Sequence, residues 1–259
     1  MVPHGLPTVD LIIPALNEEA NMQCLLATLP WPQLRHVIVA DNGSTDRTAD
    51  LARAGGAQIV LEPRRGYGAA CSAALDWICR RAPSPDLVAF LDADLADDPG
   101  QLPRLIRLID KDEADLAIGS RRRQAEPGAM TAAQWIGNTL ACTLLRLSTG
   151  VRFTDLGPLR AIRWSSLQAL AMKDRTWGWT IEMQYKAARQ GLRCVEIEVP
   201  YRRRLAGRSK ISGSIVGATR AGWCIITTIV RLWWDDSGWP RGRSNGGSSG
   251  RHRTGGGRE

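Results

Sequence analysis

Four aspartates stand within seven positions of the run "FLDADLADDP", which covers residues 90–99. The run begins as a strand-like apolar stretch, and side chains two residues apart on a strand point the same way, as Asp92 and Asp94 would. Two adjacent carboxylates cannot both stay ionised comfortably without a cation between them. Mg²⁺ or Mn²⁺, completed by a diphosphate, satisfies that requirement. The spacing therefore predicts a divalent metal site on Asp92 and Asp94.

The other two aspartates of the run have a different expected role. Asp97 and Asp98 stand before Pro99, and this combination is a frequent signal for the start of a helix. We therefore assign helix capping to Asp97 or Asp98. An EF-hand does not fit, because the run lacks the central glycine and the terminal glutamate of that calcium loop.

Two earlier segments also carry polar groups after apolar stretches: "IIPALNEE" (residues 12–19) and "IVADNGSTDRT" (residues 38–48). An acid or amide at these places is suited to hydrogen-bond a base and a ribose. Capping of the following helices by Asn17 and Asp46 is the alternative. The glycines of "RRGYGAA" permit close backbone approach, but the phosphate loop GxxxxGK[ST] is absent, which disfavours ATP hydrolysis.

The elements that must position these groups alternate between strand and helix. The apolar pattern predicts strands at residues 8–13, 36–40, 58–61, 86–91 and 115–119, with helices at 17–29, 46–54, 66–81 and 101–110 between them. This alternation is typical of a parallel sheet covered on both faces. Ligands of such sheets bind at the carboxyl ends of the strands, which is where the polar segments fall.

The second half of the chain is less regular. Helices are expected at 131–148 and 179–190, a strand at 193–199, and a loop with a short strand at 153–162. Residues 214–234 are mostly apolar, but their uninterrupted runs are short for a bilayer span. This segment is interpreted as an interfacial helix or, equally, as an amphipathic helix packed on the domain. Residues 237–259 have the composition of a disordered basic tail.

Composition and charge set the broad class. A chain of 259 residues that is 44% hydrophobic predicts one main domain, and a net charge of +8 favours anionic partners. The six cysteines form no CxxC pair and the three histidines no cluster, so neither zinc nor disulfides are expected and a reducing cytoplasm fits best. The N-terminus is not that of a signal peptide.

Taken together, five ordered motifs ("IIPALNEE", "ADNGSTDRT", "EPRRGYGAA", "FLDADLADDP" and "IGSRRR") resemble a family 2 glycosyltransferase. Further on, "DLGPLRAI", "WGWTIEMQYKA" and "EVPYRRRLAGRSKISG" resemble the polyprenyl-phosphate sugar transferase branch, which includes dolichol-phosphate mannose synthase. The resemblance covers residues 8–215. It implies an α/β GT-A fold, a Rossmann-like and mostly parallel sheet covered by helices, here with a C-terminal amphipathic or interfacial helix. The expected units are residues 1–213, 214–236 and 237–259.

The resemblance also implies roles for particular residues. The nucleotide-sugar site would comprise Pro14, Ala15, Asn17, Glu18, Asp41, Asp92, Ala93, Asp94 and Arg121. Asp92 and Asp94 would hold Mg²⁺ or Mn²⁺, while Arg202 and Lys210 would meet donor and acceptor phosphates. Asp94, Arg121 and Glu182 are the candidate catalytic residues. Relatives place a glutamine at the position of Ala96, so either Asp97 or water would supply that metal contact here.

The implied reaction is a metal-dependent, inverting transfer from a nucleoside diphosphate sugar. A phosphate acceptor is already ionised at neutral pH, so the protein needs only to neutralise its charge and orient it. The cations of residues 202–210 could do both and therefore favour a phosphate acceptor. A polyprenyl phosphate and a cytoplasmic enzyme held peripherally at a membrane surface are therefore expected. One alternative is a soluble or glycan hydroxyl acceptor with Glu182 as general base. The other is a non-catalytic nucleotide-sugar or nucleic-acid binder, although no nucleic-acid-binding motif is present.

Overall fold

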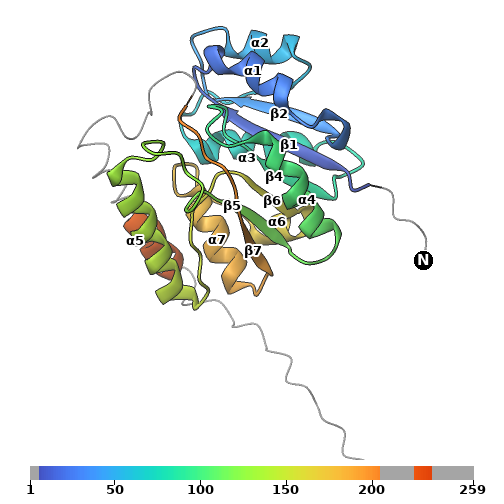
Figure 1. Ribbon diagram of the computed structural model, residues 1–259. Helices are drawn as coiled ribbons and strands as arrows, with labels where there is room; N and C mark the ends of the chain where they lie inside the picture. Colours follow the sequence, from blue (N-terminus) through green and yellow to red (C-terminus); the bar gives the residue numbers. More distant parts are fainter. Residues whose placement is uncertain (1–5, 205–224, 235–259) are drawn as a thin grey trace, which may run out of the picture.

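The computed structural model describes residues 6–204 and 225–234. A seven-stranded sheet in the order β3-β2-β1-β4-β6-β5-β7 forms its centre (Figure 1). The strands are β1 (Val9–Ala15), β2 (His36–Asp41), β3 (Gln58–Leu61), β4 (Leu87–Phe90), β5 (Leu116–Ser120), β6 (Arg160–Arg163) and β7 (Cys194–Glu198). Six of these seven strands were predicted at nearly the observed positions, and β6 lies in the segment for which a short strand was expected.

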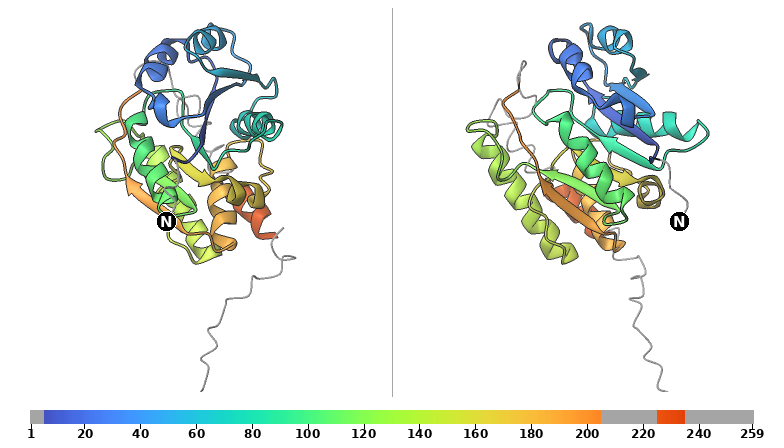
Figure 2. Two further views of the ribbon diagram at one scale, coloured as in Figure 1. Left: turned by 90° about the vertical axis from the view of Figure 1, so that its right-hand side faces the viewer. Right: turned by 45° about the vertical axis from the view of Figure 1, so that its right-hand side comes forward.

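Helices cover both faces of the sheet (Figure 2). The helices of the described residues are α1 (Glu19–Thr28), α2 (Thr48–Ala54), α3 (Tyr67–Cys79), α4 (Leu102–Asp110), α5 (Ala132–Thr149), α6 (Trp164–Leu170) and α7 (Trp179–Arg189), with short 3₁₀ turns η1 (Trp31–Gln33) and η2 (Pro99–Gln101). Residues 225–234 form one more helical stretch. The sequence analysis did not predict α6, because its seven residues follow β6 without an intervening turn signal.

Two hydrophobic clusters hold these layers together. Alternate residues of β1 point to opposite faces, so that Leu11 packs with α1, α2 and α4, while Ile12 packs with α3, α5, α6 and α7. The helix at 225–234 joins the second cluster through Ile229 and Leu232, which are 6% and 5% exposed. Among residues 6–204 and 225–234, no helix is long and apolar enough to cross a bilayer.

The direction of β6 departs from the regular alternation. β6 runs antiparallel to both of its neighbours, β4 and β5, while the remaining pairs in the sheet are parallel. The residues that precede β6 therefore lie at the same edge of the sheet as the residues that follow β4 and β5. This reversal brings the segment around Asp155 to the carboxyl ends of the parallel strands.

Candidate functional site

The predicted metal carboxylates follow β4. Asp94 is 5% exposed, and its Oδ1 accepts a 3.0 Å hydrogen bond from the backbone N–H of Ala96. Its Oδ2 lies 2.9 Å from Arg204 Nη2. The Oδ1 of Asp92 is buried without a partner, and the hydroxyl of Tyr67 lies near this carboxylate. Burial and then the neighbouring Asp94 raise the pKa of Asp92 to about 7.

This arrangement fits a divalent cation held by two carboxylates. The orphaned Oδ1 of Asp92 is an unsatisfied acceptor next to a second carboxylate, which is the condition that a cation relieves. Among residues 6–204 and 225–234, no three His, Cys, Asp or Glu side chains are arranged as a ready-made metal cage. A cation here would therefore complete its ligand shell with diphosphate oxygens and water, as Mg²⁺ commonly does.

Asp97 and Asp98, either of which was predicted to cap a helix, have different roles in the structure. Asp98 is the cap of η2, because its side chain accepts a hydrogen bond from the N–H of Gly100. Asp97 is not a cap: it is 1% exposed and neither carboxylate oxygen has a hydrogen-bond partner. Burial first, and also Asp92 and Asp94, raise the pKa of Asp97 well above its usual range, although Arg121 opposes this.

Arg121, at the end of β5, is fixed by a partner that the sequence analysis missed. Asp155 accepts hydrogen bonds from Arg121 Nε and Nη2, both at 2.7 Å, and from the Arg121 backbone N–H at 2.8 Å. Burial opposes ionisation of both groups, yet the charge pair lowers the pKa of Asp155 and raises that of Arg121. The guanidinium also lies 5.0 Å from the ring centre of Tyr201. The aspartate of the motif "DLGPLRAI" is Asp155, and this acid was the feature of the sequence that could have indicated the contact.

Residues 201–204 dock directly on the aspartate run. The N–H of Arg202 donates to the carbonyl of Ala96 at 2.8 Å, and Asp97 and Tyr201 form an isolated β-bridge. The side chain of Arg202, predicted to meet a phosphate, is exposed, whereas Arg204 is the cation that reaches Asp94. From the sequence, Arg204 was predicted only as one of the cations that could neutralise an acceptor phosphate, and its contact with Asp94 was not predicted. Lys210, the other predicted phosphate ligand, lies outside the described residues.

The predicted nucleotide segment lies at the ends of β1 and β2. Pro14 and Ala15 pair with Ala40 and Asp41 in the sheet. Asn17, which has φ +50°, accepts a 2.8 Å hydrogen bond from the N–H of Thr45. This left-handed residue also explains why α1 begins at Glu19 and not at residue 17.

Hydrogen bonds also fix Asp41, at the end of β2, and Glu18, in the loop after β1. Asp41 is 4% exposed and accepts from the N–H of Ser44 at 2.9 Å. The N–H of Glu18 donates to Thr48 Oγ1 at 2.8 Å. Asp46, considered as a helix cap, accepts from the N–H of Thr48 at 3.0 Å. The two loops are thus tied to each other, which supports a preformed cradle at this edge of the sheet.

Asn42 shows why an amide and not a carboxylate follows Asp41. Its amide nitrogen donates to the carbonyls of Glu62 and Arg64 at 3.0 and 2.6 Å, and its oxygen accepts from the N–H of Gly66 at 2.8 Å. A carboxylate cannot donate either of the first two bonds. Asn42 therefore fixes the loop that leads into α3 and carries Tyr67 to Asp92.

The glycines of "RRGYGAA" admit a second segment, residues 174–176. Gly66 has φ +146°, and a Cβ added there would lie 2.1 Å from the carbonyl oxygen of Arg175. A Cβ added at Gly68 would lie 2.2 Å from the carbonyl oxygen of Asp174. The N–H of Gly68 donates to the carbonyl of Thr176 at 3.0 Å. The start of α3 is thus held against this segment by close backbone contact. The glycines were predicted to permit a close backbone approach, although its partner was not specified.

Glu182, the candidate base, lies in the first turn of α7 and is 1% exposed. Its carboxylate accepts hydrogen bonds from the N–H groups of Lys173 and Asp174, the shortest at 2.6 Å, and pairs with Lys186 at 2.7 Å. These contacts hold the same segment that packs on Gly66 and Gly68. This geometry supports a positioning role for Glu182 and disfavours a role as general base.

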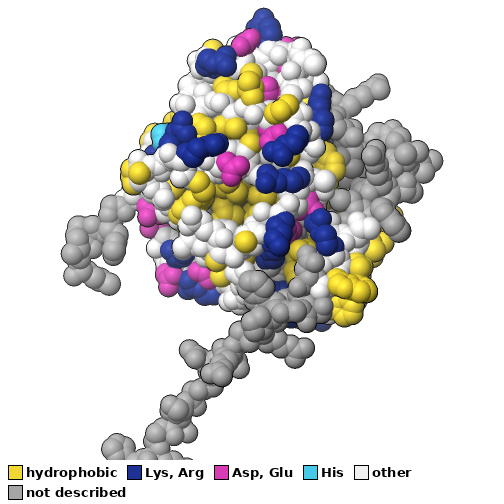
Figure 3. All heavy atoms as spheres, turned by 180° about the vertical axis from the view of Figure 1, so that it is seen from behind, with side chains coloured by type: hydrophobic (Ala, Val, Ile, Leu, Met, Phe, Trp, Pro, Cys, Tyr) yellow, Lys and Arg dark blue, Asp and Glu magenta, His cyan; other side chains and the backbone are white. Residues whose placement is uncertain are grey.

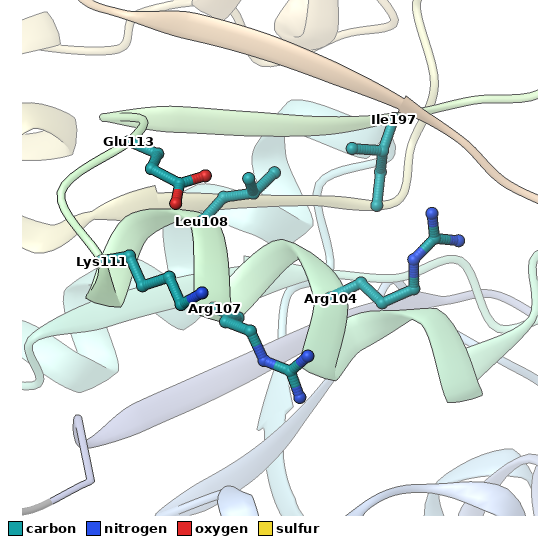
Figure 4. Close-up of a pocket in the computed structure, with 6 residues that line it drawn as sticks. All are labelled: Arg104, Arg107, Leu108, Lys111, Glu113 and Ile197. Carbon is teal, nitrogen blue, oxygen red and sulfur yellow. The ribbon is translucent and has the colours of Figure 1, made fainter.

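A separate surface groove lies between α4 and β7, away from the motif residues (Figure 4). Its described lining residues are Arg104, Arg107, Leu108, Lys111, Glu113 and Ile197. The three cations are exposed and no buried acid faces them there, so the groove lacks the carboxylate pair that gives the strand ends their chemistry.

Comparisons with known proteins agree with this geometry. The model of the family "Glycosyl transferase family 2" matches residues 10–158. An uncharacterized glycosyltransferase of Mycobacterium tuberculosis is 38% identical over 87% of this chain and 96% of its own. The undecaprenyl-phosphate mannosyltransferase of Micrococcus luteus is 32% identical over 80% of this chain and 88% of its own.

A solved structure shares the fold. Glucosyl-3-phosphoglycerate synthase from Mycobacterium tuberculosis, in complex with Mn²⁺, UDP and glucosyl-3-phosphoglycerate, superposes with a TM-score of 0.68. It is 23% identical, and the match covers 87% of this chain and 79% of the other. At that identity the likeness establishes the α/β GT-A-like fold, as predicted.

Proposed function

The chain belongs to glycosyl transferase family 2, and from that premise we propose that it moves a sugar from a nucleoside diphosphate sugar to a polyprenyl phosphate. The observation that carries this proposal is the convergence of Asp92 and Asp94 with Arg121 and Arg204 at one edge of the sheet. Two carboxylates suited to a cation stand beside two guanidiniums suited to phosphate oxygens. That combination recognises a metal-bound diphosphate.

The donor would lie across the ends of β1, β2 and β4. The 14–18 and 41–46 loops would hold the nucleoside, and Ala93, buried between the two aspartates, leaves room at the strand end. Asp92 and Asp94 would hold Mg²⁺ or Mn²⁺, with Asp97 or water in place of the missing ligand at Ala96. Such a cation supplies positive charge that stabilises the departing diphosphate.

The sugar transfer itself needs few protein groups. An oxygen of the acceptor phosphate attacks the anomeric carbon from the face opposite the diphosphate, so the configuration inverts. The bond between the anomeric carbon and the diphosphate oxygen breaks, and its electron pair leaves with the diphosphate. Arg121 and Arg204 would neutralise this growing negative charge, while Arg202 and Lys210 would orient the acceptor phosphate.

The acceptor follows from the charge of the site. A phosphate acceptor needs no general base, which agrees with a Glu182 carboxylate occupied by backbone N–H groups and Lys186. A relative whose printed name is undecaprenyl-phosphate mannosyltransferase supports a polyprenyl chain on that phosphate. The enzyme would then work peripherally at the cytoplasmic face of the membrane.

A two-stage experiment tests this function. A thermal-shift screen of nucleoside diphosphate sugars with Mn²⁺ first identifies the donor, because a ligand that binds the native state raises its apparent stability. The labelled donor is then incubated with polyprenyl phosphate, and transfer is measured in the organic extract. Product in that extract, absent in Asp94→Asn, is expected.

Matched variants sharpen the result. Asp98→Asn changes a neighbouring acid that caps η2 and accepts a hydrogen bond from Gln101, away from the proposed metal, so this variant should retain most of the transfer activity. Glu182→Gln should lower stability more than the turnover of the folded fraction. Label that reaches a hydroxyl acceptor but never a lipid, together with turnover abolished in folded Glu182→Gln, would establish the alternative in which Glu182 is the base.

A further inference from the structure

Large hydrophobic side chains are exposed along one side of α5. Ile136, Leu140 and Leu147 are 70%, 38% and 78% exposed, and their spacing places them on one stripe of the helix. Leu145, on the inner side of the same helix, is fully buried. The helix therefore has two apolar sides, of which only one is used by the core.

The helix at 225–234 is divided in the same way. Its inner side packs on the core through Ile229 and Leu232. Its outer side exposes four large side chains, by 40% to 73%: Ile226, Val230, Trp233 and Trp234. Single exposed hydrophobic residues are ordinary, but a contiguous set of this size marks a binding surface.

The two helices that carry these stripes touch each other. A Cβ added at Gly137 of α5 would lie only 3.7 Å from Cδ1 of Ile225. In the ribbon drawing the red-orange helix is seen behind α5 (Figure 1). Seen from behind, hydrophobic side chains gather at the lower right, on the side where α5 lies (Figure 3).

The inner side of the 225–234 helix lies against residues that border the catalytic site. A Cβ at Gly178 would lie 2.5 Å from Oγ1 of Thr228, so the residues before α7 touch the 225–234 helix. The preceding Trp177 is 50% exposed and stacks on Tyr67 with ring centres 6.0 Å apart. The hydroxyl of Tyr67 in turn lies near the carboxylate of Asp92. The inner side of the 225–234 helix is thus linked through residues 177–178 and Tyr67 to the metal carboxylates.

We propose that the outer stripes of α5 and the 225–234 helix form a docking surface for a lipid bilayer that contains anionic lipids. This inference rests on the proposed function, because an acceptor phosphate on a polyprenyl chain is presented at a bilayer surface. Because the inner side of the 225–234 helix touches the residues before α7, docking would hold the diphosphate site close to the headgroup layer. The lipid acceptor would then be reached from the side of the molecule formed by α5 and the 225–234 helix.

Three observations favour a bilayer over another occupant. Tryptophan is enriched at the boundary between headgroups and acyl chains, and Trp233 and Trp234 end the exposed stripe. Arg146 is exposed next to Leu147 on α5, so a cation accompanies the apolar side chains as in interfacial helices. The sequence that continues after Trp234 carries five arginines against three acids, a balance that attracts anionic headgroups.

Vesicle flotation with the full chain tests this surface without any need for activity. Vesicles of phosphatidylcholine, with and without phosphatidylglycerol, are mixed with wild type, Leu147→Gln, and a double variant with Trp233→Ser and Trp234→Ser. Each change is expected to weaken partitioning by about tenfold or more, because each removes a large apolar side chain from the contact. Leu61→Gln, at the equally exposed Leu61 on edge strand β3, should partition like wild type.

Circular dichroism confirms that the variants are folded, and light scattering gives their oligomeric state. Wild type that stays in solution, or variants that float as well as wild type, would overturn the proposal. So would a wild-type dimer that the tryptophan changes convert to a monomer, since the surface would then join two copies of the chain. Flotation that depends on this surface, without sugar transfer to lipid, would refute the proposed function and leave the docking surface standing.

Discussion

Arg204 Nη2 lies 2.9 Å from Oδ2 of Asp94, so a guanidinium from the segment after β7 neutralises one of the two carboxylates suited to a metal. The contact joins residues 110 positions apart and places a cation where a metal and its diphosphate would bring their own charges. Arg204 is 29% exposed in its side chain, so it can be displaced without unpacking the core.

Arg204→Gln should therefore change metal and nucleotide binding in opposite directions. With no nucleotide present, Mn²⁺ should bind about fivefold more tightly, because a competing ion pair worth ~1 kcal/mol is removed. The nucleoside diphosphate found by the donor screen should bind several-fold more weakly in the presence of Mn²⁺, because one phosphate-binding cation is lost. Titration calorimetry measures both. Arg203→Gln is the control, because Arg203 contacts the carbonyl of Pro127. Tighter or unchanged nucleotide binding would remove Arg204 from the site.

Asp155→Asn should destabilise the fold strongly. The change leaves Arg121, which has only 12% of its side chain exposed, without its bidentate carboxylate. Breaking a buried ion pair from one side costs about 3–5 kcal/mol, whereas Asp50→Asn breaks an exposed pair with Arg53 and should cost under about 0.5 kcal/mol. Urea unfolding of the two variants measures the difference. Similar losses in both would show that Asp155 does not hold Arg121 in solution.

Two glycine-to-alanine changes should have effects of opposite sign. In Gly68→Ala, the new methyl group would lie 2.2 Å from a backbone oxygen of Asp174, and such overpacking costs about 1–3 kcal/mol. In Gly137→Ala, the nearest described atom is 3.7 Å away on a side chain, and helix propensity should add about 0.5–1 kcal/mol. Melting temperatures test both changes. A Gly68→Ala protein as stable as wild type would contradict the close packing of α3 on residues 174–176.

Acid should selectively remove one contribution to stability. Hydrogen bonds from Arg193, ahead of the opposing effect of burial, lower the pKa of Asp115 to about 2. Because the unfolded pKa is near 3.9, the ionised form stabilises the fold above about pH 4, and this stabilisation disappears as the pH falls through 2. Asp115→Asn should cost about 1 kcal/mol at neutral pH, after allowance for solvent screening, and almost nothing near pH 2. Urea unfolding at several pH values measures the gap, and a constant gap would contradict this assignment.

Much of the fold follows from local pattern. The strands of the first half were predicted because each is a short apolar run that ends at a polar turn, and parallel strands deliver those turns to one edge. Asp92, Asp94, Asp41 and Arg121 accordingly meet at that edge, as expected. The missed element, α6, has only seven residues, and the start of α1 moved because Asn17 adopts a left-handed conformation.

The partners of the site residues could not be predicted in the same way. Asp155 reaches Arg121 only because β6 runs antiparallel between β4 and β5, and no local pattern states the direction of a four-residue strand. Arg204 and not Arg202 meets Asp94 because the backbone of Arg202 is bonded to Ala96, which fixes where each following side chain points.

The family, the α/β fold and the carboxylates suited to a metal could be predicted from the sequence, because these depend on residue types at short spacings. The three-dimensional packing was needed to show that Asp98 is the cap while Asp97 is buried, that Glu182 holds a backbone segment, and that two helices in contact each expose an apolar stripe. These outcomes depend on contacts between residues far apart in the chain. Their distances are set by how the sheet and its helices pack.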